Sequence, residues 1–181
     1  SDATNDVVFT RNNASLASLA IDPTVTSDSG NHLIRRVNSN AEVSTFAGMP
    51  GLSGYIDGPS GVARFNNPQG VFVDRLGQVY VADAGNNAIR KIDASGRVST
   101  LARDVVFNNP QGIVVDALGS VYVTSYDGHC IIQINPEGQF QIFAGVVGQS
   151  GVADGTASEA RFNQPRGLGI DDFGNLYVAD F

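Results

Sequence analysis

The chain has 181 residues, enough for one domain with a substantial core, and its 18 Asp and Glu against 11 Lys and Arg give a formal charge of −7. A nucleic-acid-binding surface has to be basic to neutralise phosphates, so this balance argues against DNA or RNA as a partner. No apolar stretch approaches the ~20 residues that cross a bilayer, so we expect no membrane span in this chain.

The N-terminal segment, residues 1–15, contains a strand-like run at residues 7–10 and a glycosylation sequon at Asn13. If the protein is secreted, Asn13 is a candidate glycosylation site. The single cysteine, Cys130, cannot form a disulfide within the chain. This disfavours a small disulfide-stapled module and leaves the compartment open.

A repeated unit begins at residue 16 and recurs to the end of the chain. Its clearest copies start with Asn-Pro-Gln-Gly, at residues 67–70 and 109–112, and a third starts at residues 164–167. Each copy has a short apolar strand ending in Asp, a turn containing glycine, and a second strand, which is the pattern of a β-hairpin. Two more strands follow, as at residues 88–92 and 98–101, so the unit has the four strands of one propeller blade.

These motifs resemble those of NHL repeats. Asn31-His32-Leu33 spells the signature of that family, and residues 80–92 are similar to its repeat consensus. The resemblance covers roughly residues 16–181. It implies a closed propeller, most often of six blades, that serves chiefly as a binding platform.

The repeat and the resemblance together predict an all-β fold: a β-propeller of about four NHL blades, each a four-stranded antiparallel sheet, with the last blade incomplete. We expect the blades at residues 16–47, 68–102, 110–144 and 165–181. The last copy stops after its second strand. Two explanations stay open: the chain is a fragment or the ordered part of a longer propeller, or another chain pairs with the open strand edge.

Two long insertions, at residues 47–68 and 144–165, separate blades and resemble each other in sequence. Each contains Asp-Gly and ends in Ala-Arg-Phe, so we expect an ordered loop with a turn at Asp-Gly and one helical turn before the arginine. Antiparallel strands alternate in direction, so the insertions and the loops bearing His32 and His129 should share one face. Variable loops on a rigid scaffold are where binding usually resides. We therefore predict a binding surface formed by Tyr55, Asp57, Tyr126, His129 and Asp154.

Glycine and phenylalanine are expected to control the contact between blades. The glycine of each Pro-Gln-Gly, at Gly70 and Gly112, should let strands crowd together near the central axis. Three phenylalanines precede the first strands, and we expect them to pack between neighbouring blades: Phe65, Phe107 and Phe162.

An aspartate ends the second strand in three copies of the unit, and an asparagine follows three residues later in two of them. Short polar side chains at such positions accept bonds from turn amides, so we predict a structural, turn-capping role. Calcium binding is the alternative, because loop oxygens suit a hard cation. The residues concerned are Asp28, Asn31, Asp83, Asn86 and Asp180.

The sequence contains no recognisable catalytic constellation, and two histidines on separate loops are too few for a zinc site. We therefore expect no metal, no cofactor and a non-catalytic protein-interaction or ligand-binding module. We expect it to belong to a larger extracellular or cell-surface protein, with a protein partner or self-association. The alternative is part of a propeller enzyme, because the resemblance extends to metal-dependent lyases whose catalytic residues would lie in further blades.

Overall fold

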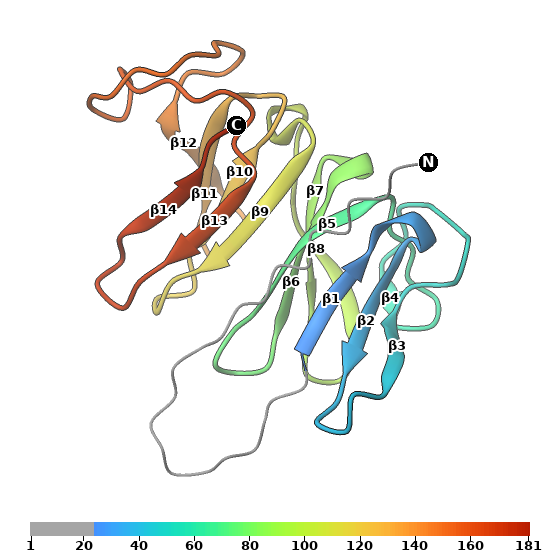
Figure 1. The fold of residues 1–181 in the computed structure, drawn as a ribbon. Coiled ribbons are helices and arrows are strands. Elements are labelled where there is room, and N and C mark those ends of the chain that lie inside the picture. Colours follow the sequence, from blue (N-terminus) through green and yellow to red (C-terminus); the bar gives the residue numbers. More distant parts are fainter. Residues whose placement is uncertain (1–23) are drawn as a thin grey trace.

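The structure is a computed structural model and describes residues 24–181 (Figure 1). Within that range the regular structure consists of strands and three single-turn 3-10 helices, and the strands form four antiparallel sheets. The predicted all-β class is therefore confirmed. The strand-like run at residues 7–10, the sequon at Asn13 and the first strand of the first copy lie outside the described residues.

Two of the sheets contain the complete four-stranded unit that the repeat predicts. Val, Ile and Tyr dominate their central strands, because β-branched and aromatic side chains suit a buried pleated surface. The first unit is β5 (Pro68–Val73), β6 (Val79–Asp83), β7 (Ala88–Ile92) and β8 (Arg97–Arg103). The second unit is β9 (Pro110–Val115), β10 (Val121–Ser125), β11 (Cys130–Ile134) and β12 (Phe140–Gly145).

The other two sheets contain parts of the same unit. Asp28 ends β1 as Asp83 ends β6, so β1 corresponds to the second strand of its unit. A three-stranded sheet is formed by β1 (Thr24–Asp28), β2 (Leu33–Val37) and β3 (Val43–Ala47). A two-stranded sheet is formed by β13 (Gly167–Ile170) and β14 (Leu176–Ala179).

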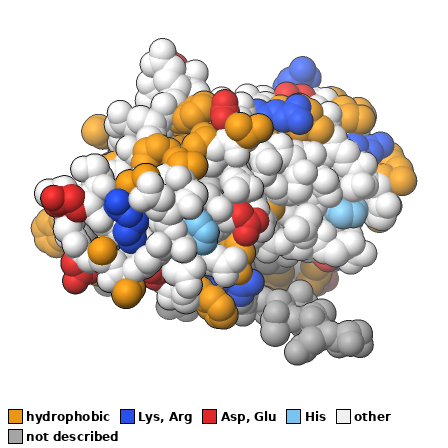
Figure 2. Space-filling view, turned by 90° about the horizontal axis from the view of Figure 1, so that it is seen from above, with side chains coloured by type: hydrophobic (Ala, Val, Ile, Leu, Met, Phe, Trp, Pro, Cys, Tyr) orange, Lys and Arg blue, Asp and Glu red, His pale blue; other side chains and the backbone are white. Residues whose placement is uncertain are grey.

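The connections gather at two opposite ends of the sheets, which we name the upper and lower sides as they lie in Figure 1. The lower side carries the short hairpin turns that join β5 to β6, β9 to β10 and β13 to β14. The upper side carries both insertions, and imidazole surface is visible there at two places (Figure 2). The upper side also carries three 3-10 turns, η1 (Ser29–Asn31), η2 (Ala84–Asn86) and η3 (Val105–Phe107). The insertions and the histidine-bearing loops therefore share one face, as the strand directions predict.

The first insertion contributes a strand that the sequence does not predict. β4 (Gly58–Pro59) pairs antiparallel with the outer edge of β8, which makes that sheet five-stranded. The expected turn at Asp57-Gly58 is therefore wrong, because Gly58 is paired with Val98. The expected helical turn is confirmed in both insertions. The carbonyl oxygen of Pro59 accepts bonds from the amides of residues 62 and 63, and that of Thr156 accepts bonds from those of residues 159 and 160.

The inner strands of successive sheets lie side by side, β5 beside β9 and β9 beside β13 (Figure 1). A Cβ added at Gly70 would lie 2.0 Å from the carbonyl oxygen of Gln111, and one at Gly112 would lie 2.3 Å from that of Arg166. These glycines therefore permit the close approach that the sequence predicts. Two hydrophobic cores lie between the sheets, with Phe65 and Phe107 fully buried in one each. None of the helices within residues 24–181 has the length and apolarity that crossing a membrane requires.

Candidate functional site

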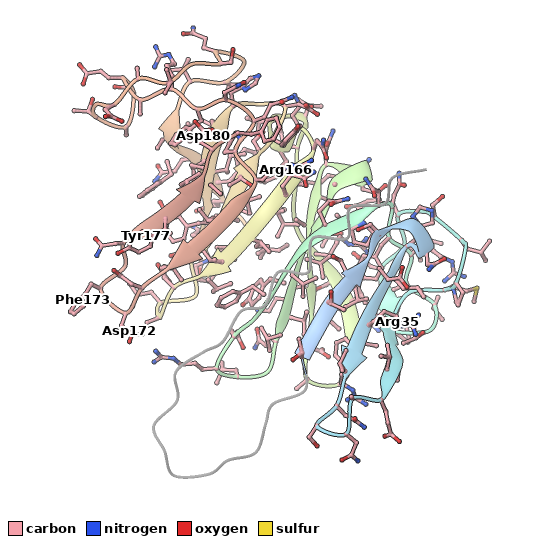
Figure 3. The ribbon with its side chains drawn as sticks, viewed as in Figure 1. Arg35, Arg166, Asp172, Phe173, Tyr177 and Asp180 are labelled. Atoms are coloured by element: carbon pink, nitrogen blue, oxygen red, sulfur yellow. The ribbon has the colours of Figure 1, made fainter. Side chains whose placement is uncertain are left out.

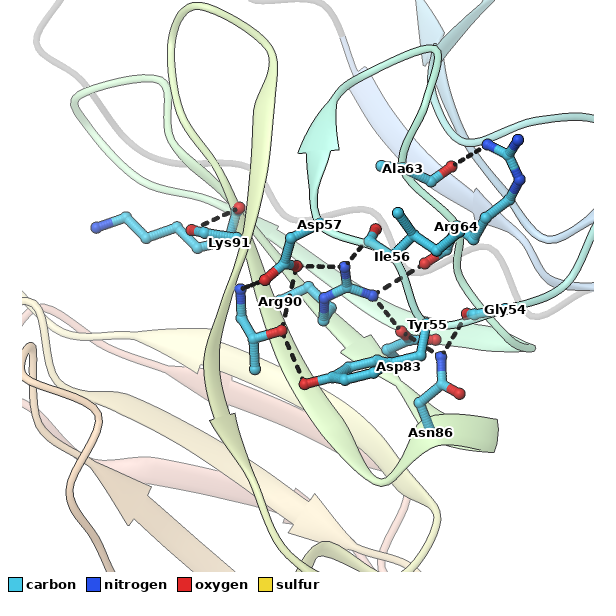
Figure 4. Close-up of polar contacts among 12 residues, drawn as sticks. Gly54, Tyr55, Ile56, Asp57, Ala63, Arg64, Asp83, Asn86, Arg90 and Lys91 are labelled. Atoms are coloured by element: carbon cyan, nitrogen blue, oxygen red, sulfur yellow. Dashed lines mark hydrogen bonds and ion pairs between the residues drawn. The ribbon is translucent and has the colours of Figure 1, made fainter.

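Arg90 on β7 is fully buried and holds the first insertion against the sheet (Figure 4). Its Nη1 donates to Asp83 Oδ2 at 2.8 Å, and its Nη2 donates to Asp57 Oδ1 at 2.5 Å. The same two nitrogens also donate to the carbonyl oxygens of Arg64 at 3.0 Å and Ile56 at 2.9 Å. One guanidinium thus joins β6, β7 and both arms of the insertion, which explains how a buried charge is tolerated.

Aromatic rings cover the same guanidinium. The Cζ atom of Arg90 lies 4.9 Å from the ring centroid of Tyr55 and 5.2 Å from that of Phe65. The hydroxyl of Tyr55 is 2.9 Å from Thr100 Oγ1, and Asp57 Oδ2 accepts the amide of Thr100 at 3.1 Å. Tyr55 and Asp57, both predicted for binding, are therefore brought together and fix the insertion along β8.

The carboxylates of the repeated aspartates bond to loops that precede inner strands. Asp83 Oδ1 accepts the amide of Asn66 at 2.7 Å, and Asp180 Oδ1 accepts that of Asn163 at the same distance. Burial raises the pKa of Asp83, while its bonds from Asn66, Asn86 and Arg90 act to lower the pKa. Asn86 Nδ2 donates to Asp83 at 2.8 Å, and in the first sheet Asn31 Nδ2 donates to Asp28 at 2.9 Å. No side-chain cap forms on the η turn that follows Asp28 or Asp83.

The histidine-bearing loops form a hydrogen-bonded link between successive sheets. In each link the residue that ends a tight turn, a histidine or in one case an asparagine, has a positive φ in the left-handed region. Its side chain accepts a hydrogen bond from the backbone amide of the residue just before the next inner strand. A histidine Nδ1 has to be unprotonated to accept such a bond. The three links are Asn67 N to His32 Nδ1 at 3.1 Å, Gln164 N to His129 Nδ1 at 3.1 Å, and Asn109 N to Asn87 Oδ1 at 2.9 Å.

The remaining predicted residues lie around the second insertion. The ring of Tyr126 has the guanidinium of Arg166 over it, with 5.3 Å between Cζ and the centroid, and Arg166 also lies 5.8 Å from the ring of Phe181. Asp154 is exposed on the insertion itself. The five predicted binding residues thus divide into two groups, one at each insertion, and do not form a single cluster.

A hollow on the lower side was not predicted. It is a cavity of about 580 Å³ lined by hairpin turns and strand ends of three successive sheets, Phe72 and Tyr80 among its lining residues. Three apolar side chains at its rim are almost fully exposed: Leu76 (76%), Leu118 (85%) and Phe173 (92%). Phe173 lies at the lower end of the two-stranded sheet in Figure 3, opposite to Asp180.

The turn chemistry explains why these apolar side chains point outwards. Asp74 Oδ1 accepts the amides of Leu76 and Gln78, both at 2.9 Å, so the carboxylate holds the turn and leaves the side chain at its tip free. Asp116 and Asp171 hold the equivalent turns in the same way. The sequence signal was an apolar residue directly before the turn glycine in all three copies.

Comparison with known proteins identifies the repeat, because residues 65–92 match the NHL repeat family. These residues run from Phe65 through β5 and β6 to the end of β7. The chain carries an NHL repeat there. The resemblance inferred from the sequence is therefore confirmed, and both Asp83 and Arg90 belong to the NHL repeat.

Curated relatives named NHL repeat-containing protein 2 match part of the chain. The human protein is 40% identical over 82 residues, and the chicken (Gallus gallus) protein is 40% identical over 76 residues. The matched segments cover 45% and 42% of this chain, but only 11% and 10% of the relatives' own length.

Solved structures with a similar fold include a Bacteroides thetaiotaomicron protein of unknown function, with a TM-score of 0.65, 22% identity, and coverage of 83% of this chain and 40% of that one. A streptogramin B lyase matches with a TM-score of 0.58, 13% identity, and coverage of 88% and 51%. Virginiamycin B lyase from Staphylococcus aureus matches with a TM-score of 0.57, 16% identity, and coverage of 87% and 47%. At such identities the likeness establishes a propeller-like fold alone.

Within residues 24–181 no group of three or more His, Cys, Asp or Glu residues could hold a metal ion.

Proposed function

We propose that this chain is a non-catalytic interaction module whose lower cavity receives an apolar side chain of a partner protein. The sheets act as successive blades of a propeller, about four in the chain, with the last incomplete. The observation that carries the proposal is the convergence of Leu76, Leu118 and Phe173 on one hollow.

Single exposed apolar residues are common on protein surfaces, whereas a group of them at the rim of a cavity marks an interaction site. The apolar lining is continued inside by Phe72, Leu101 and Ile170. Pockets that bind ligands combine such a lining with a few polar groups, and here Tyr80 and Lys91 supply them. An apolar anchor on a partner would be desolvated by the rim, which is the arrangement of an interface hot spot.

The test is a selection of peptides from a display library on the native chain, followed by affinity measurement on variants. We expect the selected peptides to lose about tenfold or more in affinity for Leu118→Ser combined with Phe173→Ser, because the rim no longer buries apolar surface. Val105→Ser is the control, since Val105 is 83% exposed but lies on the upper side. Peptides that bind the rim variant as tightly as the native chain would overturn the proposal.

The same panel tests the upper side. Tyr126→Ala and Asp154→Ala alter the surface that the sequence analysis favours. A loss of peptide affinity in these two variants, with the rim variant unaffected, would move the interaction site to the upper side. Sedimentation of the native chain and of the rim variant measures whether the same apolar rim supports self-association.

We further propose that the module works outside the cell or at its surface, where its acidic charge and its sequon at Asn13 are compatible with secretion. Expression through a secretory pathway should yield a glycan at Asn13. Mass spectrometry before and after enzymatic deglycosylation measures this, and an unmodified Asn13 in secreted protein would contradict the use of the sequon.

A further inference from the structure

The two complete units differ at their outer edges. In the first unit the outer strand β8 is covered by β4, where Gly58 pairs with Val98. The amide of Thr100, further along β8, donates to Asp57 Oδ2 at 3.1 Å. Gly58 and Asp57 both belong to the first insertion, which precedes this unit in the chain. With that cover in place, Val98 has no exposed surface.

The second unit has no such cover, because the connection that precedes it is short. The chain passes from β8 to β9 through residues 104–109, which form the single turn η3 and no strand. β12 is the outermost strand of its sheet, and within residues 24–181 it pairs only with β11 (Figure 1). The outer edge of β12 is therefore open where that of β8 is closed.

The register identifies the residues at this open edge: Phe140 is the counterpart of Val98, and Ile142 is the counterpart of Thr100. Phe140 is 39% exposed and Ile142 38%, although the ring of Phe140 contacts that of Phe107, with 5.1 Å between the centroids. The amide of Thr100 points away from β7 towards Asp57. Because backbone groups alternate in direction along a strand, we expect those of Phe140 and Ile142 to point away from β11 in the same way.

The open edge is also free of charge. Residues 138–153 contain no charged side chain, whereas the covered strand β8 begins with Arg97 and ends with Arg103. Proteins usually protect an exposed edge strand with charged residues or proline, and β12 has neither. Where two identical strands pair about a twofold axis, each charge lies close to its own copy and is repelled. In a chain with a net charge of −7, the uncharged β12 therefore suits pairing with itself.

We propose that β12 is a self-association edge, along which the chain pairs with a second copy of itself. The two β12 strands run antiparallel, with Gln141 opposite Gln141 of the second copy at the twofold axis. In this register Phe140 lies opposite Ile142 of the second copy, and their outward amides and carbonyl oxygens bond to each other. Phe140 and Ile142 of both copies share one face of the joined sheet, where they bury the apolar surface that each chain exposes alone.

This interaction is separate from the lower cavity, because no residue of β12 lines that cavity. A single strand pair gives a small interface, so we expect a weak dimer whose population rises with concentration. Sedimentation equilibrium of the native chain measures it, at concentrations from roughly 1 µM to 1 mM.

Ile142→Lys should weaken the dimer about tenfold or more, because it removes apolar contact and brings two like charges together at the axis. The fold should accept the change, since Thr100 shows that a polar side chain is tolerated at this position. Thr45→Lys is the matched control and should leave the dimer unchanged. Thr45 is exposed and lies opposite Arg35 in the outer strand β3, as Ile142 lies opposite Ile132.

A cysteine pair tests the register directly. Cα atoms of directly opposite residues in a pair without backbone bonds lie about 4.5 Å apart, which a disulfide can span. Gln141→Cys should therefore form a covalent dimer under mild oxidation, as seen on a non-reducing gel. Gln139→Cys is the control and should not, because the register puts it about 13 Å along the strand from its own copy. The native Cys130 is fully buried and does not compete.

A native chain that stays monomeric over the whole concentration range would overturn the proposal. Cross-linking of Gln139→Cys as fast as Gln141→Cys would do the same, as would an equal loss of dimer in Thr45→Lys and Ile142→Lys. Loss of the dimer in the rim variant, with Ile142→Lys unaffected, would place self-association at the lower cavity instead.

Discussion

At the scale of single residues, Arg90 shows how one position in the unit can be either ionic or apolar. It lies opposite Val81 in the register, and Ile132 lies in the same way opposite Val123 in the next sheet. Ser125 there takes the place of Asp83. The two partners have thus changed together, which is expected because a buried charge without its counterion is far more costly than a matched apolar pair.

Arg90→Ile should lower the free energy of unfolding by about 3–5 kcal/mol, since Asp83 is left buried without its main counterion. Asp83→Ser combined with Arg90→Ile copies the neighbouring sheet and should recover part of that loss. Chemical denaturation of both variants and of Asp83→Ser alone completes a double-mutant cycle. A double variant as unstable as the sum of the single variants would show that the two residues are not coupled.

Tyr80 gives the chain a predicted sensitivity to alkaline pH. Burial, together with the charge of and the bond to Asp74, raises the pKa of Tyr80 from its ordinary value of 10.0 to about 12. The pKa of Tyr80 in the folded chain lies above its pKa in the unfolded chain. The protonated phenol therefore contributes fully to the stability of the fold below pH 10, and this contribution is lost as the pH rises towards 12. The stability difference between the native chain and Tyr80→Phe should therefore shrink over that range, as measured by urea denaturation at each pH. A constant difference would contradict it.

At the scale of elements, tight turns supply one set of hydrogen-bonded links between successive sheets. His129 is held in the left-handed region at a φ of 57°, and it accepts the amide of Gln164 at the entrance to the next sheet. Asn87 performs the same role in the preceding unit. Asparagine tolerates this backbone conformation better than most residues and also offers an acceptor, so the two types are interchangeable here.

His129→Ala should lower the free energy of unfolding by about 1–3 kcal/mol, because the amide of Gln164 loses its acceptor and alanine is strained at a positive φ. His129→Asn should cost clearly less. Thermal or urea denaturation compares the two, and an equal loss in both variants would mean that ring packing, rather than the hydrogen bond, is what His129 provides.

Much of the element arrangement follows from the sequence, because each unit repeats the same apolar run, turn and glycine. β4 could not be predicted, since its pairing with the edge of β8 depends on a contact between Asp57 and Thr100 that lie 43 residues apart. The roles of Tyr55 and Asp57 were missed for the same reason: their partner Arg90 was recognised only as part of a strand. The lower cavity escaped prediction because only the fold brings Leu76 and Phe173 to a common rim.

At the scale of the whole molecule, the inner strands fix how closely the sheets approach. Gly70 and Gly112 face backbone oxygens of the next sheet at distances that exclude a side chain, whereas Gly169 on β13 has ordinary room, with 3.9 Å between an added Cβ and the Cβ of Tyr177. On the inner strands, the steric requirement for glycine at these two positions arises because one backbone meets another.

Gly70→Ala and Gly112→Ala should each lower the free energy of unfolding by about 1–3 kcal/mol, because backbone atoms have to move apart to admit a methyl group. Gly169→Ala is the control and should change stability little. Denaturation curves for the three variants distinguish these outcomes, and a control as destabilised as Gly112→Ala would refute the steric explanation.

The turn-to-amide links have a consequence for cooperativity. Each joint connects one sheet only with the next, as in the coupled sites of a one-dimensional chain, so the total stability approaches a sum of intrinsic and nearest-neighbour terms. Loss of the link at His129, as in His129→Ala, should then increase the rate of amide hydrogen exchange in β9–β14. The amides of β2 should keep their protection, because two further links, at Asn87 and His32, separate β2 from that site.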